Sequence, residues 1–231
     1  MEKCLVLFSG GIDSTTALYW SLKNFDWVEA LTFDYGQKHK IEIDMARKIT
    51  RLLNIKHKII LVDLTQVGGS SLTDDQIPIP QLETIEEIKQ GILPTYVPFR
   101  NGIFLSLAAA YAEVIEVKNI VCGFNVIDSP NYPDTRREFV ESMEKAINSG
   151  TKAAFEDWKF KLITPLIGMT KSEIIQYGLS LGADYSYSIS CYQGREIPCG
   201  KCASCLIRKK AWQDLNLKDH LILRLKREGK I

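Results

Sequence analysis

The first group of residues whose types and spacing suggest chemistry is the loop Phe8-Ser9-Gly10-Gly11-Ile12-Asp13-Ser14-Thr15-Thr16. It follows an apolar run and leads directly into a helical stretch, which predicts the order strand, tight turn, helix. Two consecutive glycines allow backbone N–H groups to turn inward, and the hydroxyls of Ser9, Ser14 and Thr15 can donate hydrogen bonds. Together with the positive end of the following helix, they predict a binding site for a phosphate or a pyrophosphate.

Asp13 fits such a site because a carboxylate beside phosphates can hold Mg²⁺, directly or through water. Neither G-x-x-x-x-G-K-[ST] nor G-x-G-x-x-G occurs anywhere in the chain, which excludes the Walker and dinucleotide-binding motifs. The loop resembles instead the S-G-G-x-D-S loop of the PP-loop (N-type) ATP pyrophosphatases, which cleave ATP between the α and β phosphates and transfer AMP to an oxygen atom. The local alternative is an ordinary glycine turn in which Ser and Thr cap a helix.

The second group is a run of cysteines spaced C-x₇-C-x₂-C-x₂-C, namely Cys191, Cys199, Cys202 and Cys205. Four thiols within fifteen residues, the last two spaced to share one helical turn, can converge on a tetrahedral ion. Thiolates would fill every position and leave none for water, so the ion should be structural, and Zn²⁺ is the expected metal. An iron–sulfur cluster and unliganded thiols are the alternatives.

Further polar residues stand where predicted strands end and predicted helices begin. Asp34 and Tyr35 follow the second apolar strand. Arg100 and Asn101 stand just before a long predicted helix. The guanidinium can bind a carboxylate or a planar base through its bidentate fork. Helix capping by Asn101 is the alternative.

Lys171 is expected in the first turn of a helix that a capping box, Thr170 with Glu173, should open. A cation in the first turn opposes the helix dipole, which suggests that Lys171 faces a phosphate. A solvated surface lysine is the alternative. The histidines, at positions 39, 57 and 220, show no spacing that suggests a site, and we expect structural or surface roles for them.

These groups need a scaffold, and the chain alternates apolar strands with helices. Strands are expected at 4–8, 27–33, 57–62, 119–123 and 160–163, and helices over 14–23, 40–53 and 102–116. A further helix should start at the turn within 131–139 and end near 148, and another should begin after 170. This alternation predicts an α/β, Rossmann-like fold with a parallel sheet covered by helices on both faces. Ligands bind past the carboxyl ends of such strands, where the phosphate loop and Asp34 should meet.

The predicted domains are a nucleotide-binding unit over 1–185 and a cysteine-containing helical segment over 186–231 packed on it. Residues 63–98 have no clear period, which is typical of a functional loop or a disordered one. A surplus of nine Lys or Arg over three Asp or Glu in 200–231 is expected to be a solvated helical face, with an RNA-contacting tail as the alternative.

Composition is that of an ordinary globular protein, with 45% hydrophobic and 25% charged residues. The net charge of +1 gives no global field that would recruit a membrane or DNA. No apolar segment has the length of a bilayer span, and no signal peptide opens the chain. We therefore expect a cytoplasmic protein, in which structural disulfides would not persist.

Taken in order, the motifs resemble the 7-cyano-7-deazaguanine synthase family, the PP-loop enzymes of queuosine and archaeosine precursor synthesis. The resemblance covers nearly the full length of the chain. It rests on 8–16, Leu31-Thr32-Phe33-Asp34-Tyr35-Gly36-Gln37, Ser71-Leu72-Thr73 with Ile77-Pro78-Ile79-Pro80, Tyr96-Val97-Pro98-Phe99-Arg100-Asn101, Tyr132-Pro133-Asp134, Thr164-Pro165-Leu166 and the cysteine run.

The resemblance implies that ATP adenylates the carboxylate of 7-carboxy-7-deazaguanine, that ammonia displaces AMP, and that a second adenylation converts the amide to a nitrile. ATP with Mg²⁺ is expected at residues 8–16 with Asp34 and Tyr35. Catalytic roles are expected for Ser9, Asp13, Ser14 and Lys171. The deazaguanine is expected to contact Tyr96, Arg100, Asn101, Tyr132, Asp134 and Arg136. The resemblance also implies a homodimer.

One stretch departs from the family pattern. The family usually has Ser-Gly-Tyr-Pro-Asp-Cys-Arg followed by an acidic residue, whereas this chain has Ser129-Pro130-Asn131-Tyr132-Pro133-Asp134-Thr135-Arg136-Arg137-Glu138. Because the altered residues are expected beside the acceptor, they affect which nucleophile attacks the activated carboxylate. The chain is also similar to proteins of antiphage operons that stop at an amide, joining the deazapurine carboxylate to an amine such as a protein N-terminus, and Arg137 could select such a partner.

Two RNA-related alternatives stay open. One is an RNA-binding zinc-knuckle protein with a vestigial nucleotide fold, which the basic segment near the end of the chain supports. The other is a tRNA-modifying PP-loop enzyme, although the usual tRNA-binding extensions are not evident.

Overall fold

The computed structural model describes residues 1–89, 91–127 and 132–231. Its centre is a parallel sheet with the strand order β3-β2-β1-β4-β5. The strands are β1 (Lys3–Leu7), β2 (Trp27–Asp34), β3 (Lys56–Leu61), β4 (Asn119–Cys122) and β5 (Lys161–Ile163). The strand order reverses between β1 and β4, and such a switch point opens a crevice at the carboxyl ends of the strands.

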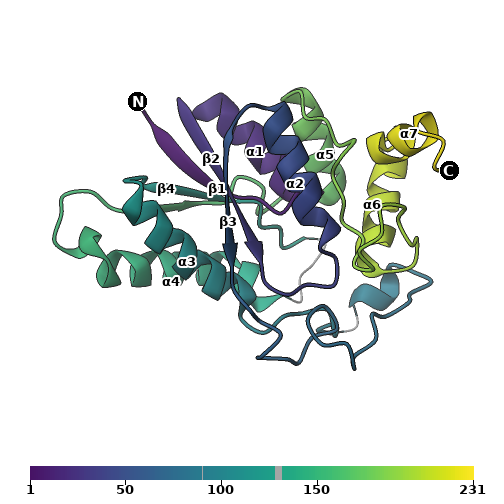
Figure 1. The fold of residues 1–231 in the computed structure, drawn as a ribbon, viewed down its shortest axis with the longest axis horizontal. Coiled ribbons are helices and arrows are strands. Elements are labelled where there is room, and N and C mark those ends of the chain that lie inside the picture. The colour runs from purple at the N-terminus through teal and green to yellow at the C-terminus, as the bar shows by residue number, and fades with distance from the viewer. Residues whose placement is uncertain (90, 128–131) are drawn as a thin grey trace.

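Helices cover both faces of the sheet (Figure 1). On one face lie α1 (Ile12–Asn24), α2 (Ile41–Leu52) and α5 (Lys171–Ser180), and on the other lie α3 (Arg100–Val114) and α4 (Arg137–Gly150). The inner strands β1, β2 and β4 are nearly continuous apolar runs because both of their sides are buried. The predicted α/β architecture is confirmed.

The cysteine-containing segment adds α6 (Ala203–Asp214) and α7 (His220–Arg227) at one end of the molecule (Figure 1). Ala211 and Trp212 of α6 are buried in the core that α1 and α5 share. Short 3₁₀ helices occur at η1 (Glu86–Lys89), η2 (Pro133–Thr135) and η3 (Lys152–Ala154). The division into 1–185 and 186–231 stays a prediction.

The described part of the irregular segment 63–98 passes the end of the sheet toward which the strands run (Figure 1). It is held against the cysteine-containing segment, since Leu82 donates its backbone N–H to the Lys201 carbonyl at 2.8 Å. Leu82 and Ile88 are buried with Ala203 of α6. This segment therefore forms packed structure beside the carboxyl ends of the strands.

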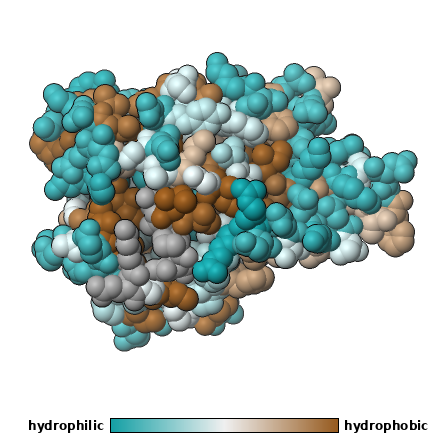
Figure 2. Space-filling view, turned by 180° about the vertical axis from the view of Figure 1, so that it is seen from behind, coloured by the Kyte–Doolittle hydropathy of each residue, from teal (hydrophilic) through white to brown (hydrophobic). Residues whose placement is uncertain are grey.

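The surface is a mosaic of residue types. Seen from behind, hydrophobic residues gather near the middle of the molecule, while hydrophilic residues cover most of the arm on the right (Figure 2). Among the described residues, every helix is too short or too polar to cross a lipid bilayer.

A half-buried histidine, His57, lies beside the contact between β2 and the end of β1, the strand that leads into the phosphate loop. The Thr32 hydroxyl donates to the Phe8 carbonyl and lies 2.7 Å from His57 Nε2. Thr50 Oγ1 lies 3.1 Å from the other ring nitrogen. Burial, with a smaller contribution from Arg47, lowers the pKa of His57 from 6.5 to about 4.

The pH dependence of stability should report this histidine. In the folded protein His57 is neutral down to about pH 4, whereas in the unfolded chain it gains a proton near pH 6.5. Its contribution to stability is therefore complete above pH 6.5 and is lost as the pH falls toward 4. The melting temperature should fall over this window by more in the wild type than in His57→Gln. Parallel pH profiles for the two proteins would contradict this assignment.

Candidate functional site

A cavity of about 310 Å³ lies at the carboxyl ends of β1, β2 and β4. One part of its wall is the phosphate loop with Lys171, a second is apolar and includes Leu31, Phe33 and Phe104, and a third includes Arg100 and Tyr132. A smaller cavity of about 50 Å³ adjoins the third part, and Arg100, Asn101, Tyr132, Thr135 and Tyr192 line both. The structure thus brings together, from distant segments, most of the residues predicted to bind the nucleotide and the substrate.

The phosphate loop is held by its own side chains. Gly11 donates its N–H to Ser9 Oγ at 3.3 Å, and Ser14 Oγ donates to the Gly11 carbonyl at 3.2 Å. The Ser9 and Ser14 hydroxyls lie 3.2 Å apart. Gly10 takes a positive φ of 83°, whereas Gly11, the N-cap of α1, has an ordinary φ of −75°. Only the first glycine therefore adopts the left-handed backbone conformation that glycine favours.

The two glycines should differ sharply on substitution. A Cβ at Gly10 would lie 3.2 Å from the Glu42 carbonyl and 3.3 Å from the Ala46 nitrogen, and its φ is unfavourable for alanine. We expect Gly10→Ala to lower the free energy of unfolding by about 2 kcal/mol. A Cβ at Gly11 meets only Ser9 Oγ at 3.5 Å and Ile189 O at 3.9 Å, but Gly11 lines the cavity.

Gly11→Ala should therefore keep its stability and lose ATP affinity by about tenfold, which corresponds to about 1.4 kcal/mol. Chemical denaturation and ATP titration of both variants check the pair. Equal losses of stability in the two variants, or full ATP affinity in Gly11→Ala, would contradict the assignment.

Asp13 and Lys171, from the first turns of α1 and α5, contact each other in the cavity wall. Lys171 Nζ donates to both carboxylate oxygens, and the two side chains are 24% and 17% exposed. The predicted capping box is confirmed, since Thr170 and Glu173 exchange the expected hydrogen bonds. Because Lys171 lines the cavity and is largely buried, its position agrees with the phosphate-facing role.

Four residues predicted to bind ATP lie outside the residues that line the cavity. Gly10 turns its backbone toward α2, and Thr15 is fully buried. Thr16 Oγ1 bonds Tyr185 Oη at 2.6 Å and so joins α1 to the segment after α5. The Asp34 carboxylate accepts the Gly36 N–H at 3.4 Å. Phe8, Ser9, Gly11, Ile12, Asp13, Ser14 and Tyr35 do line the cavity.

Asn101 and Asp134 bind each other. The Asn101 backbone donates to Asp134 Oδ2 at 3.0 Å, and its side-chain amide donates to the Asp134 carbonyl at 3.2 Å. The capping alternative for Asn101 is wrong, because Phe99 is the N-cap of α3 and Asn101 lies inside the helix. The buried Asp134 carboxylate satisfies that helix terminus instead.

Three of the four remaining substrate candidates, Tyr96, Arg100 and Tyr132, form an aromatic wall with a cation. Tyr96 and Tyr132 stack with ring centroids 5.9 Å apart, and both line the smaller cavity. Arg100 Nη1 donates to Tyr35 Oη at 3.2 Å. Burial raises the pKa of Tyr35 to about 12, so the phenol stays protonated. Arg136 is exposed and is not among the residues lining either cavity, and its substrate role stays a prediction.

Several residues of the cavity wall escaped the sequence reasoning, namely His39, Glu42, Ser190, Tyr192, Ser204 and Arg208. His39 was expected to be a structural or a surface residue, and it is 6% exposed. Desolvation by burial lowers the pKa of His39, so the ring is neutral. Arg208 makes an ion pair with Asp219 and donates to the Ser188 carbonyl at 2.7 Å. Its position one helical turn after Cys205 was the available signal.

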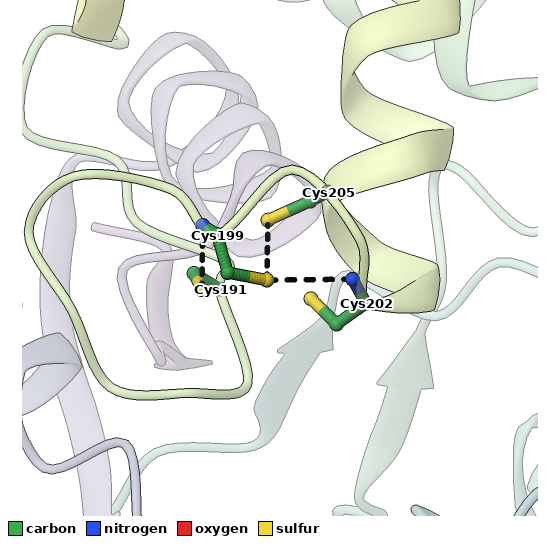
Figure 3. A group of neighbouring side chains, drawn as sticks. All are labelled: Cys191, Cys199, Cys202 and Cys205. Carbon is green, nitrogen blue, oxygen red and sulfur yellow. Dashed lines mark hydrogen bonds between the residues drawn. The ribbon is translucent and has the colours of Figure 1, made fainter. Parts of the chain in front are cut away.

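The four cysteines converge, as Figure 3 shows. Their sulfur atoms lie within 4.8 Å of one another, and Cys199 and Cys205 Sγ are 3.9 Å apart. Four sulfurs at about 2.3 Å from a tetrahedral ion would be separated by about 3.8 Å. Backbone N–H groups of Cys199 and Cys202 point at sulfurs of Cys191 and Cys199, at 3.4 and 3.3 Å. Such donors favour thiolates, so the group fits a metal ion.

The cysteine-containing segment also contacts the phosphate loop. Ile189 donates its N–H to the Gly10 carbonyl at 3.2 Å. Gly194 packs so closely on the His39 backbone that a Cβ there would lie 2.9 Å from His39 Cα. The cysteine-containing segment therefore forms one wall of the same cavity.

The stretch that departs from the family pattern is only partly described. Ser129, Pro130 and Asn131 lie outside the described residues. Thr135 is buried, and its hydroxyl donates to the Tyr132 carbonyl at 2.9 Å. Arg137 is the exposed first residue of α4.

Comparison with known proteins identifies the family. The family model described as queuosine biosynthesis protein QueC matches residues 3–216. The 7-cyano-7-deazaguanine synthase of Trichodesmium erythraeum is 44% identical over 221 residues, with 95% of this chain and 100% of the relative covered. That of Nostoc punctiforme is 42% identical over 221 residues, with 95% and 99% covered.

A solved structure agrees on the fold. The crystal structure of a 4-thiouridine synthetase–RNA complex with bound ATP matches with a TM-score of 0.52 at 22% identity. The match covers 97% of this chain and 53% of that chain. The chain therefore belongs to the QueC family of queuosine biosynthesis proteins, alongside these 7-cyano-7-deazaguanine synthases.

Proposed function

We propose that this chain, a member of a family of C–N bond-forming ligases, converts 7-carboxy-7-deazaguanine and ammonia to 7-cyano-7-deazaguanine at the expense of two ATP. The observation that carries the proposal is the single cavity in which the phosphate loop, with Asp13 and Lys171, faces Arg100 and a tyrosine-rich wall. One reactant is a polyphosphate and the other is a flat heterocycle with a carboxylate. This cavity offers a complementary wall to each.

Adenylation solves a chemical problem. A carboxylate is a poor electrophile because its leaving group would be oxide. When a carboxylate oxygen attacks the α-phosphorus, pyrophosphate leaves, and ammonia then displaces AMP from the acyl carbon to give an amide. The amide oxygen attacks a second ATP in the same way. Loss of AMP together with the remaining N–H protons leaves the nitrile.

The residues mainly orient the reactants and balance charge that moves between phosphate oxygens. We assign the polyphosphate to the loop N–H groups with the Ser9 and Ser14 hydroxyls. Lys171 then neutralises the oxygens of the leaving pyrophosphate. Asp13 would hold Mg²⁺, and this ion would supply further positive charge beside the phosphates. Arg208 lines the same cavity, but its hydrogen bonds to Asp219 and Ser188 give it a positioning role.

The described contacts support our assignment of the acceptor side. Arg100 carries the charge that would attract the substrate carboxylate or its ring carbonyl, and Tyr96 and Tyr132 offer flat surfaces for the ring. Asp134 acts indirectly, because its carboxylate fixes the start of α3. We assign Zn²⁺ to the four cysteines as a structural ion. A homodimer and a cytoplasmic location complete the proposal.

A second candidate function is coupling of the activated carboxylate to a protein amine, with an amide as the final product. The family pattern has Cys where this chain has Thr135, and the Thr135 hydroxyl is occupied by the Tyr132 carbonyl. Arg137 is exposed beside it, where an incoming polypeptide could reach it.

Incubation with ATP, Mg²⁺ and 7-carboxy-7-deazaguanine, with and without ammonium, tests the proposal. Mass spectrometry should show ammonium-dependent nitrile, with two AMP for each nitrile. An amide or adenylate that never becomes nitrile would favour the amine-coupling function. Absence of AMP release would overturn both.

A further inference from the structure

Glu42 is a carboxylate in the cavity wall to which the proposed reaction gives no role. It lies in the first turn of α2, which packs on Gly10 of the phosphate loop. Its side chain is only 12% exposed, and it lines the cavity. A carboxylate in such a place needs hydrogen-bond donors or a cation, because burying an unpaired charge is costly.

The protein supplies only part of that need. The Gln37 amide donates to Glu42 Oε1 at 3.0 Å, and Gln37 is fixed because its Oε1 accepts the Tyr35 N–H at 2.8 Å. His39 Nε2 lies 3.4 Å from Glu42 Oε2, but this buried imidazole is neutral. Within the described chain, no lysine or arginine forms an ion pair with Glu42. Carboxylate lone pairs are thus left for a ligand.

The surroundings favour a flat heterocycle as that ligand. The His39 ring lies 6.3 Å from Tyr35 and 6.0 Å from Tyr192, centroid to centroid, and all three residues line the cavity with Glu42. Mg²⁺ keeps several waters in its coordination shell, which ring faces do not accommodate well. Asp13, the carboxylate that the proposed function assigns to that ion, also lines the cavity.

On the basis of the proposed function, we propose that Glu42 recognises the 2-aminopyrimidinone edge of the deazaguanine. Its carboxylate accepts hydrogen bonds from the N1–H and 2-amino groups, and Arg100 serves the acceptor atoms of the ring and its carboxylate. Adenine has no N1–H donor, so the same contact keeps the adenine of ATP out of the acceptor half of the cavity. Glu42 is then a specificity-determining residue.

The test compares two ligands in three proteins. The ligands are 7-carboxy-7-deazaguanine and its analogue without the 2-amino group, titrated calorimetrically in the presence of a non-hydrolysable ATP analogue. The proteins are the wild type, Glu42→Gln, and the matched control Asp44→Asn, whose side chain is 66% exposed on the same helix. Should Glu42→Gln unfold, Glu42→Asp keeps the charge but shortens its reach and serves in its place.

The wild type and Asp44→Asn should bind the parent acid about 10- to 100-fold more tightly than the analogue. Glu42→Gln should lose this preference and keep its affinity for the ATP analogue. An intact preference in Glu42→Gln would overturn the inference. Loss of ATP affinity in Glu42→Gln would also overturn the inference and would indicate that Glu42 is a ligand of Mg²⁺.

Lost turnover with unchanged binding of both ligands would also overturn the inference, in favour of a proton acceptor. Nitrile formation by the wild type separates the two proposals. If the wild type forms nitrile and Glu42→Gln discriminates normally, only the role of Glu42 fails. If the wild type does not bind the acid, both proposals fail.

Discussion

Replacing Lys171 with methionine is expected to lower kcat/KM for AMP release by about 10²- to 10³-fold, the usual loss when one preorganised charge at a reacting oxygen is removed. Methionine keeps much of the side-chain volume and removes the ammonium group that contacts Asp13. Measured with saturating deazaguanine, most of the loss should appear in kcat, because the charge on the leaving pyrophosphate is largest in the transition state.

The control for this substitution is Lys210→Met. Lys210 is 56% exposed and pairs with Asp214 one helical turn away, at 2.7 Å. The Lys210→Met variant should keep the wild-type rate and stability, because an exposed ion pair of this kind contributes little to the free energy of unfolding. Thermal unfolding of both variants separates catalysis from folding. A Lys171→Met enzyme within threefold of the wild-type rate would show that this lysine only holds Asp13.

Removal of the metal that we assign to the four cysteines should lower both the stability of the protein and its affinity for ATP. Cys202→Ala, or treatment with a strong chelator, is expected to destabilise the protein by several kcal/mol, since structural zinc sites contribute a large part of the folding energy of small domains. ATP affinity should fall with it. The cause is the wall formed by Ile189, Tyr192 and Arg208, which the cysteine loop positions.

Cys4→Ala is the matched control, because Cys4 is also a fully buried thiol but lies in β1, away from the cluster. It should retain the metal and lose about 1 kcal/mol of stability, as small core deletions do. Elemental analysis of the wild type should give one zinc per chain. Iron with sulfide would replace the zinc assignment, and a chelated protein with full ATP affinity would contradict the link to the cavity.

The elements that carry these residues could be predicted because their signals are local. Apolar runs predicted the strands, the Thr170–Glu173 box predicted the start of α5, and the cysteine spacing predicted that the four thiols would converge. Each depends on neighbours within a few residues. The phosphate loop belongs to the same class, since its glycine and serines bond one another.

The other features of the candidate site could not be predicted, because they depend on contacts between segments that are distant in the sequence. Asp134 caps a helix that begins thirty-four residues earlier, at Arg100, so Asn101 looked like the cap in the local sequence. Thr16 was grouped with the phosphate loop, yet its hydroxyl faces Tyr185. Glu42 and Arg208 lie in unremarkable helical surroundings in the sequence, and only the tertiary fold turns them toward the cavity.

The hydrogen bond from Ile189 to Gly10 also orders events during synthesis of the chain. Gly10 leaves the ribosome early, but its partner and the cysteines emerge only near the end. The first strands can pair before then, while the nucleotide cavity still lacks one wall. The cavity can therefore take its folded shape only after the wall residues between Ile189 and Arg208 have been made.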